Sequence, residues 1–82
     1  MSEDNKDIEP KVRDLNRARQ SLVEELEAMI WYDERISATK DSSLAKVLAY
    51  NRDDEKEHAS LLLAWLSKHD DALKKEMSKA GV

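Results

Sequence analysis

Apolar residues recur at alternating steps of three and four along two long stretches of the chain, and this period predicts two amphipathic helices. The first stretch covers about residues 11–38 and the second about residues 43–68. Between them, residues 39–43 combine weak helix formers with good N-cap candidates, which predicts a turn between antiparallel helices. A short third helix is predicted between Asp70 and Gly81.

The composition favours an all-α protein with one domain. The chain has 82 residues with one glycine, one proline and no cysteine, and 39% of them are charged. Residues 1–10 are polar and end in a proline, so we expect a flexible N-terminal tail followed by a helical domain over residues 11–82. So short a chain without disulfides buries only a modest core, and we therefore expect it to self-associate.

Charge and hydropathy exclude several classes of partner. The 14 basic and 18 acidic residues give a net charge of −4 without a basic cluster, which disfavours nucleic-acid binding. No apolar run approaches the roughly 20 residues that span a bilayer, and the N-terminus does not resemble a signal peptide. We expect a cytoplasmic protein that does not bind membranes. Without cysteine, any bound metal must be held by oxygen and nitrogen atoms.

Both apolar seams are interrupted by polar residues at the same height of the predicted hairpin. Glu25 lies on the first seam, and Glu55 and His58 lie on the second. Glu25 precedes residue 40, in the predicted turn, by 15 residues, whereas Glu55 and His58 follow it by 15 and 18. At about 1.5 Å per residue, all three lie roughly 22 to 27 Å from the turn. Because a buried carboxylate is costly without a partner, they need counter-charges, hydrogen bonds or a metal ion.

The spacing of Glu55 and His58 is that of the Glu-x-x-His motif of di-iron helical bundles. Alone, a histidine on a seam is more often a core residue and a glutamate often reaches outward to solvent. Three such residues at one level favour a metal site, and carboxylates with imidazole suit iron, manganese or zinc. Because three ligands are too few for two ions, a two-fold dimer of hairpins would complete the set at the subunit interface.

Two segments resemble the encapsulated ferritins, namely residues 24–27 (EELE) with the following Trp31 and Tyr32, and residues 51–58 (NRDDEKEH). The similarity covers about residues 22–65. It implies a two-helix half-ferritin that dimerises into a ferritin-like four-helix bundle, assembles into a decameric ring and resides inside an encapsulin nanocompartment, bound to the shell protein. It also implies ferroxidase activity, in which Fe(II) is oxidised with dioxygen at a di-iron centre and passed on for storage.

The resemblance assigns Glu25, Glu55 and His58 as ferroxidase ligands and places Tyr32 beside the centre. Tyr32 lies seven residues after Glu25 on the same helix face. Its hydroxyl is therefore either a hydrogen-bond partner of a ligand carboxylate or part of an ordinary aromatic contact, and the sequence leaves both open.

Helical spacing separates Glu24, Glu27 and Trp31 from the seam and groups them on the opposite face of the first helix. Similar proteins use the matching residues as a metal access site that attracts iron toward the ferroxidase centre. The residues alone are also consistent with an acidic face whose tryptophan contacts another protein. Two other functions stay open: a non-catalytic helical interaction module, and a di-metal protein that binds zinc or manganese without redox turnover.

Overall fold

Every regular element that the computed structural model describes, over residues 5–82, is helical. A 3₁₀ turn, η1 (Asn5–Asp7), precedes the long helices α1 (Pro10–Ala38) and α2 (Ser42–His69), and the short helix α3 (Asp71–Lys79) follows them. The predicted all-α hairpin with a short C-terminal helix is thereby confirmed. The flexible tail predicted for residues 1–10 falls partly outside the described residues and stays a prediction.

The first two helices have local causes for their limits. Pro10 occupies the first turn of α1, where its fixed φ suits a helix and its missing N–H removes no helical hydrogen bond. Thr39 is extended, with φ −72° and ψ 143°, and ends α1. Asp41 caps α2, because its Oδ1 accepts hydrogen bonds from the backbone N–H groups of Ser43 at 2.9 Å and Leu44 at 3.1 Å.

The corner between α2 and α3 is organised by one carboxylate. Asp70 Oδ1 caps α3 by accepting from the Leu73 N–H at 3.1 Å, and Asp70 Oδ2 accepts from Arg19 of α1 at the same distance. The chain leaves α3 through Gly81, whose φ of +82° lies in the left-handed region that glycine adopts without strain. The start of α3 is therefore set by a local cap and a contact with α1, and the chain turns at its end through a left-handed glycine.

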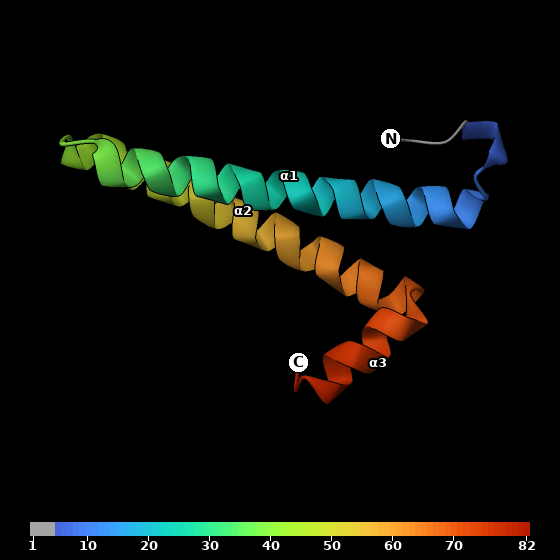
Figure 1. The fold of residues 1–82 in the computed structure, drawn as a ribbon. Coiled ribbons are helices and arrows are strands. Elements are labelled where there is room, and N and C mark those ends of the chain that lie inside the picture. Colours follow the sequence, from blue (N-terminus) through green and yellow to red (C-terminus); the bar gives the residue numbers. More distant parts are fainter. Residues whose placement is uncertain (1–4) are drawn as a thin grey trace.

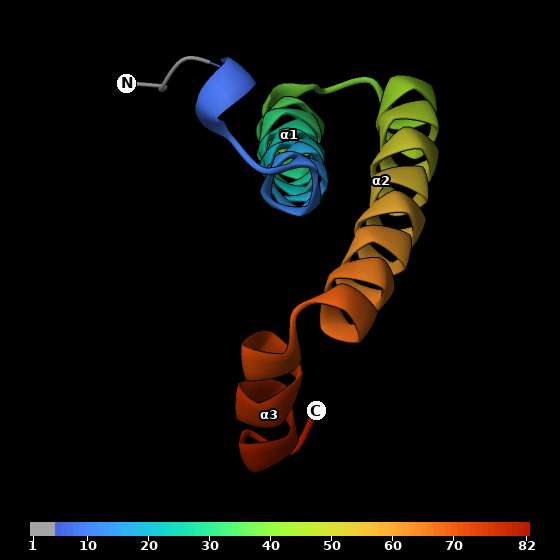
Figure 2. The same cartoon turned by 90° about the vertical axis from the view of Figure 1, so that its right-hand side faces the viewer.

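The two long helices form an open hairpin. Figure 1 shows α1 and α2 meeting at the turn and diverging toward the open end of the hairpin. At that end, α3 turns away from α2. The view in Figure 2 likewise places α3 well away from α1. The radius of gyration is 16.5 Å, whereas a compact domain of this length has about 12 Å. The molecule is elongated, with a large surface for its small volume.

Most of the apolar surface of the hairpin stays exposed. Among residues 5–82 only Ala59 and Leu66 are buried apolar residues, and both belong to α2. An exposed strip on α1 comprises Val12, Val23, Leu26 and Ile30. At 100° per residue these four side chains fall within an arc of about 60°. Such a strip is typical of a surface that packs against a partner, although the oligomeric state itself stays a prediction.

No helix in the described part of the chain combines the length and the apolar character that crossing a bilayer requires.

Candidate metal centre

The structure brings the three polar seam residues together across the hairpin. Glu25 lies near the middle of α1, and Glu55 and His58 lie near the middle of α2, one turn apart on the same face. One ligand atom of each residue lies within 4.8 Å of the other two. Glu25, Glu55 and His58 form the one group of three or more potential metal ligands found within residues 5–82.

The spacing of these atoms suits coordination of a common ion. His58 Nδ1 lies 3.5 Å from Glu25 Oε2 and 3.4 Å from Glu55 Oε2. Two ligand atoms that each lie about 2.1 Å from an ion, at a tetrahedral angle, are about 3.4 Å apart. The imidazole nitrogen and either carboxylate oxygen therefore already have the separation that a shared transition-metal ion requires.

The burial of the centre is uneven. The side chains of Glu25 and Glu55 are 23% and 21% exposed, whereas that of His58 is 52% exposed. Glu25 Oε2 is enclosed and has no hydrogen-bond partner among the described residues. Because enclosed carboxylate oxygens normally accept hydrogen bonds, this atom calls for a closer donor or cation than His58 Nδ1 at 3.5 Å. The cluster is closed on the glutamate side and open on the side of the histidine.

Tyr32 packs through its ring, and its hydroxyl makes no hydrogen bond within residues 5–82. The ring meets that of Trp31 edge to face, with centroids 5.1 Å apart and an interplanar angle of 89°. This arrangement matches the aromatic-contact alternative in the single chain. The role of Tyr32 beside a metal centre stays a prediction, because a second copy could still bring a carboxylate to the hydroxyl.

The three residues predicted as a metal access site, Glu24, Glu27 and Trp31, are exposed, and none of them belongs to the cluster. Glu24 accepts a hydrogen bond from Gln20 at 3.3 Å. The Trp31 ring is covered by Arg35, whose guanidinium carbon lies 3.0 Å from the ring centroid. The metal access role stays a prediction.

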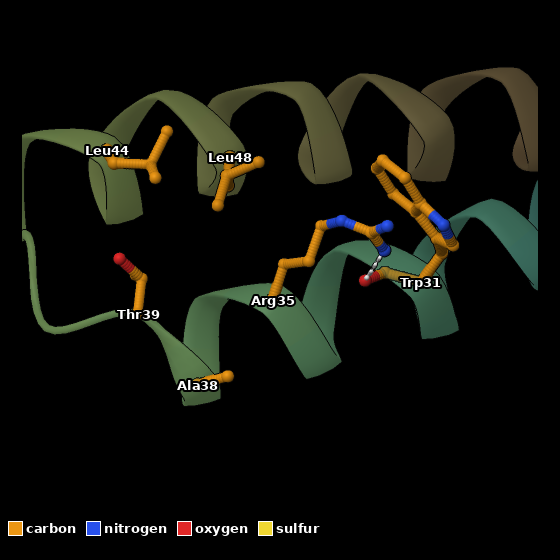
Figure 3. A pocket seen from close by; sticks show the side chains of 6 residues that line it. All are labelled: Trp31, Arg35, Ala38, Thr39, Leu44 and Leu48. Atoms are coloured by element: carbon orange, nitrogen blue, oxygen red, sulfur yellow. Dashed lines mark hydrogen bonds between the residues drawn. The ribbon is translucent and has the colours of Figure 1, made fainter.

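Trp31 faces the second helix rather than lying wholly on the far face of α1. Figure 3 shows Trp31 and Arg35 extending from α1 toward α2. They border an open hollow of about 510 Å³ near the turn. Its lining also includes Ala38, Thr39, Leu44 and Leu48. Helical spacing predicts only the direction in which the Cβ atom of Trp31 leaves the helix. The long indole side chain extends from there around α1 toward α2.

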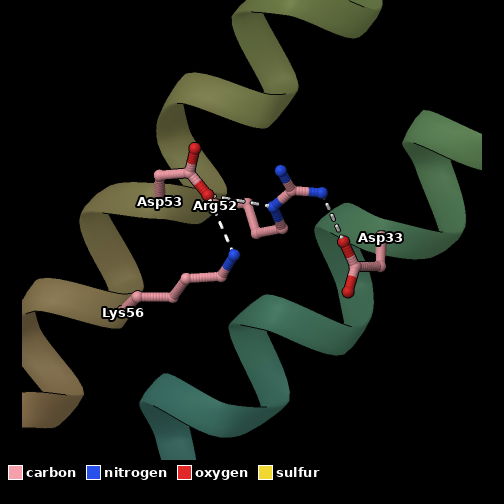
Figure 4. A network of polar contacts seen from close by, with 4 residues as sticks. All are labelled: Asp33, Arg52, Asp53 and Lys56. Atoms are coloured by element: carbon pink, nitrogen blue, oxygen red, sulfur yellow. Dashed lines mark hydrogen bonds and ion pairs between the residues drawn. The ribbon is translucent and has the colours of Figure 1, made fainter.

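A polar network that the sequence pattern did not predict joins α1 and α2 (Figure 4). Arg52 Nη1 donates to Asp33 of α1 at 2.9 Å, and Arg52 Nε donates to Asp53 at 3.2 Å. Lys56 Nζ lies 3.1 Å from the same Asp53 oxygen. The bond to Asp33, followed by that to Asp53, raises the pKa of Arg52 above its usual value. The contacts from Lys56 and then Arg52 lower the pKa of Asp53.

Only one contact of this network could be predicted from the spacing of residues in the sequence. Asp53 and Lys56 are three residues apart, a spacing at which helical side chains meet. Asp33 and Arg52 are 19 residues apart and lie at unequal distances from the turn. Their contact depends on how the two helices tilt and on the length of the arginine side chain, which no periodicity reports.

The sequence of the chain is similar to one family of proteins and to two named relatives. The profile of the EncFtn-like family matches residues 1–80. A ferritin-like protein of Thermotoga maritima is 48% identical over 68 residues, covering 78% of this chain and 60% of that protein. An encapsulated ferritin-like protein of Rhodospirillum rubrum is 53% identical over 55 residues, covering 67% and 39% respectively. The chain thus spans less than two thirds of the length of either relative.

A solved structure shows the same arrangement of helices. The crystal structure of a protein from Nitrosomonas europaea superposes with a TM-score of 0.92 at 44% sequence identity, covering 96% of this chain and 87% of that one. The resemblance found in residues 24–32 and 51–58 is therefore confirmed by comparisons that extend over nearly the whole chain. The protein belongs to the EncFtn-like family of encapsulated ferritin-like proteins.

Proposed function

We propose that this protein is a ferroxidase that oxidises Fe(II) to Fe(III) with dioxygen, at a di-iron site formed across a homodimer interface. The observation that supports this most directly is the convergence of Glu25, Glu55 and His58 on one point between two helices. Membership of a ferritin-like family supports iron as the metal. The name of the Rhodospirillum rubrum relative supports storage of the product inside an encapsulin compartment.

A second copy of the chain is part of the proposal, because one chain has half of a di-iron ligand set. Di-iron bundles use a glutamate from each of two helices and a Glu-x-x-His pair from each of the other two. Two hairpins related by a two-fold axis supply that number. The exposed histidine side of the cluster leaves surface for such a partner. A larger ring of dimers is compatible with this arrangement.

The charges of the doubled site match two ferrous ions. Glu25 and Glu55 from two chains would contribute four negative charges, equal to the charge of two Fe(II) ions, while His58 binds as neutral imidazole. Each Fe(II) gives up one electron, so a pair reduces one dioxygen by two electrons, and two protons then complete hydrogen peroxide. Reduction to water would draw four electrons from two pairs. The protein contributes geometry and charge, and the iron carries the redox chemistry.

The test is to load the purified protein anaerobically with Fe(II), admit air and follow ferric absorbance together with oligomer mass. Wild type is expected to oxidise Fe(II), and Glu25→Ala, Glu55→Ala and His58→Ala are each expected to slow the reaction on the order of 100-fold, since even indirect supports of metal ligands matter 10- to 100-fold. Glu34→Ala removes an exposed carboxylate of α1 outside the cluster and serves as the matched control.

The outcomes separate the three functions. Equal oxidation by wild type and all three ligand variants would refute the ferroxidase proposal. Metal binding without dioxygen consumption would instead indicate a zinc or manganese protein, because the same ligand spacing suits those ions. Folding and assembly that are indifferent to any metal would indicate an interaction module whose polar seam residues only select the partner.

A further inference from the structure

Arg52 is a cation that could compete with a metal ion for the candidate centre. It precedes Glu55 by three residues on α2, a spacing at which helical side chains can pair. Ion pairs at this spacing occur in the same molecule between Asp14 and Arg17 and between Asp53 and Lys56. A guanidinium bound to Glu55 would occupy the carboxylate oxygens that a metal ion needs.

The structure directs this guanidinium elsewhere. Arg52 bonds across the hairpin to Asp33 at 2.9 Å and along its own helix to Asp53 at 3.2 Å (Figure 4). The Arg52 side chain is 24% exposed, whereas that of Asp33 is 59% exposed. Exposed ion pairs contribute little to stability. The consequence of this pair therefore lies in where it keeps the arginine rather than in how firmly it joins the helices.

We infer that Asp33 is a positioning residue, which holds the Arg52 guanidinium away from Glu55 and so keeps that carboxylate available to a metal ion. The inference rests on the proposed metal-binding function of the centre. Without the Asp33 carboxylate, Arg52 Nη1 loses its acceptor. Glu55, with its side chain only 21% exposed, is then an acceptor within reach on the same helix.

The experiment is a double-mutant cycle read by calorimetric titration of the metal-free protein with Zn²⁺, with circular dichroism and oligomer mass as checks of folding. Asp33→Asn is expected to weaken Zn²⁺ binding about two- to fivefold, since an exposed ion pair of modest strength no longer keeps the guanidinium from competing with the ion. Arg52→Gln is expected to bind at least as tightly as wild type. The double variant is expected to recover wild-type affinity within about twofold.

A matched control separates position from net charge. Glu34→Gln makes the same change of charge as Asp33→Asn one residue along α1, but Glu34 makes no contact with Arg52. We expect it to change Zn²⁺ affinity less than twofold. An equal loss in Glu34→Gln and Asp33→Asn would overturn the inference, because net charge alone would then explain the effect.

Two further results would also overturn it. If Arg52→Gln weakens Zn²⁺ binding, or if the double variant is not restored, the ion pair acts as a structural link between the helices. If Asp33→Asn fails to fold, the Arg52→Gln measurement still decides. If the wild-type protein binds Zn²⁺ but oxidises no Fe(II), the ferroxidase proposal is refuted and this inference is unaffected. If Asp33→Asn binds Zn²⁺ as tightly as wild type, this inference is refuted and the ferroxidase proposal is unaffected.

Discussion

The carboxylates at the two corners of the chain, the turn before α2 and the bend before α3, differ from the Glu25 carboxylate in the middle of the hairpin in the hydrogen bonds that they accept. At the corners, Asp41 and Asp70 accept hydrogen bonds from backbone N–H groups at the starts of α2 and α3. In the middle, Glu25 has an enclosed oxygen without a hydrogen-bond partner among residues 5–82. The His58 Nδ1 atom lies 3.5 Å from this oxygen.

The pKa values of the corner residues follow from those contacts. The bond from the Ser43 hydroxyl, followed by those from backbone N–H groups, lowers the pKa of Asp41 below 3.8. The Leu73 N–H is the main cause of the lowered pKa of Asp70, and Arg19 adds to it. The corner carboxylates thus accept several hydrogen bonds within the chain, whereas Glu25 Oε2 accepts none among residues 5–82 and has only the His58 ring near it. This contrast is consistent with corners that stabilise the fold and with the proposed metal-binding role of the middle.

The largest expected effect is the response of stability to metal. Zn²⁺ at about 100 times its dissociation constant should raise the free energy of unfolding of wild type by about 2.7 kcal/mol, because only the folded state binds it. Glu55→Ala should lose this increment, and Asp41→Ala should keep it. Chemical denaturation with Zn²⁺ or with a chelator measures both. An equal increment in Glu55→Ala would remove the distinction between middle and corner.

The next effect is a stabilisation of the metal-free protein. Glu25→Gln should raise its free energy of unfolding by about 1 kcal/mol, since the substitution removes a partly buried charge whose enclosed oxygen accepts no hydrogen bond among residues 5–82, and adds a donor. Glu24→Gln, one residue away and exposed, should change it by close to zero. Urea denaturation in the presence of a chelator gives the comparison. A destabilised Glu25→Gln variant would show that the middle carboxylate already has its partner.

Corner substitutions should act in the opposite direction. Asp41→Ala and Asp70→Ala should each lower the melting temperature by a few degrees, because N-terminal N–H groups of α2 or α3 lose their acceptor. Asp70→Ala also breaks the contact with Arg19. Differential scanning calorimetry follows both variants, with Asp14→Ala on the exposed face of α1 as the reference. Melting temperatures equal to that of Asp14→Ala would contradict the structural role of the corners.

The smallest effect is a dependence on acid pH. Because the folded-state pKa of Asp41 lies below its ordinary value of 3.8, its contribution to stability is present above pH 3.8 and is lost as the pH falls through the folded-state pKa. Asp41→Asn retains an acceptor for the cap but no titrating group, so its stability should fall less steeply below that pH. If denaturation series show stability falling equally steeply with pH in wild type and Asp41→Asn, the pKa of Asp41 is not lowered in the folded protein.

Local patterns in the sequence were sufficient to predict the helices. The steps of three and four, the proline at the start of α1 and the capping residues near 41 and 70 all act within one or two turns of chain. The three metal-ligand candidates could also be predicted from the sequence. They interrupt apolar seams at matched distances from one turn, and an antiparallel hairpin brings equal distances together.

The orientation of long side chains was decided only in three dimensions. The predicted seam identifies Glu25, Glu55 and His58, but the tilt of α1 against α2 turns Arg52 toward Asp33 and the Trp31 ring toward α2. Helical periodicity specifies where a side chain leaves the backbone. Which partner its distant charged or aromatic end contacts depends on the distance and angle between helices, and these arise from packing across the whole hairpin.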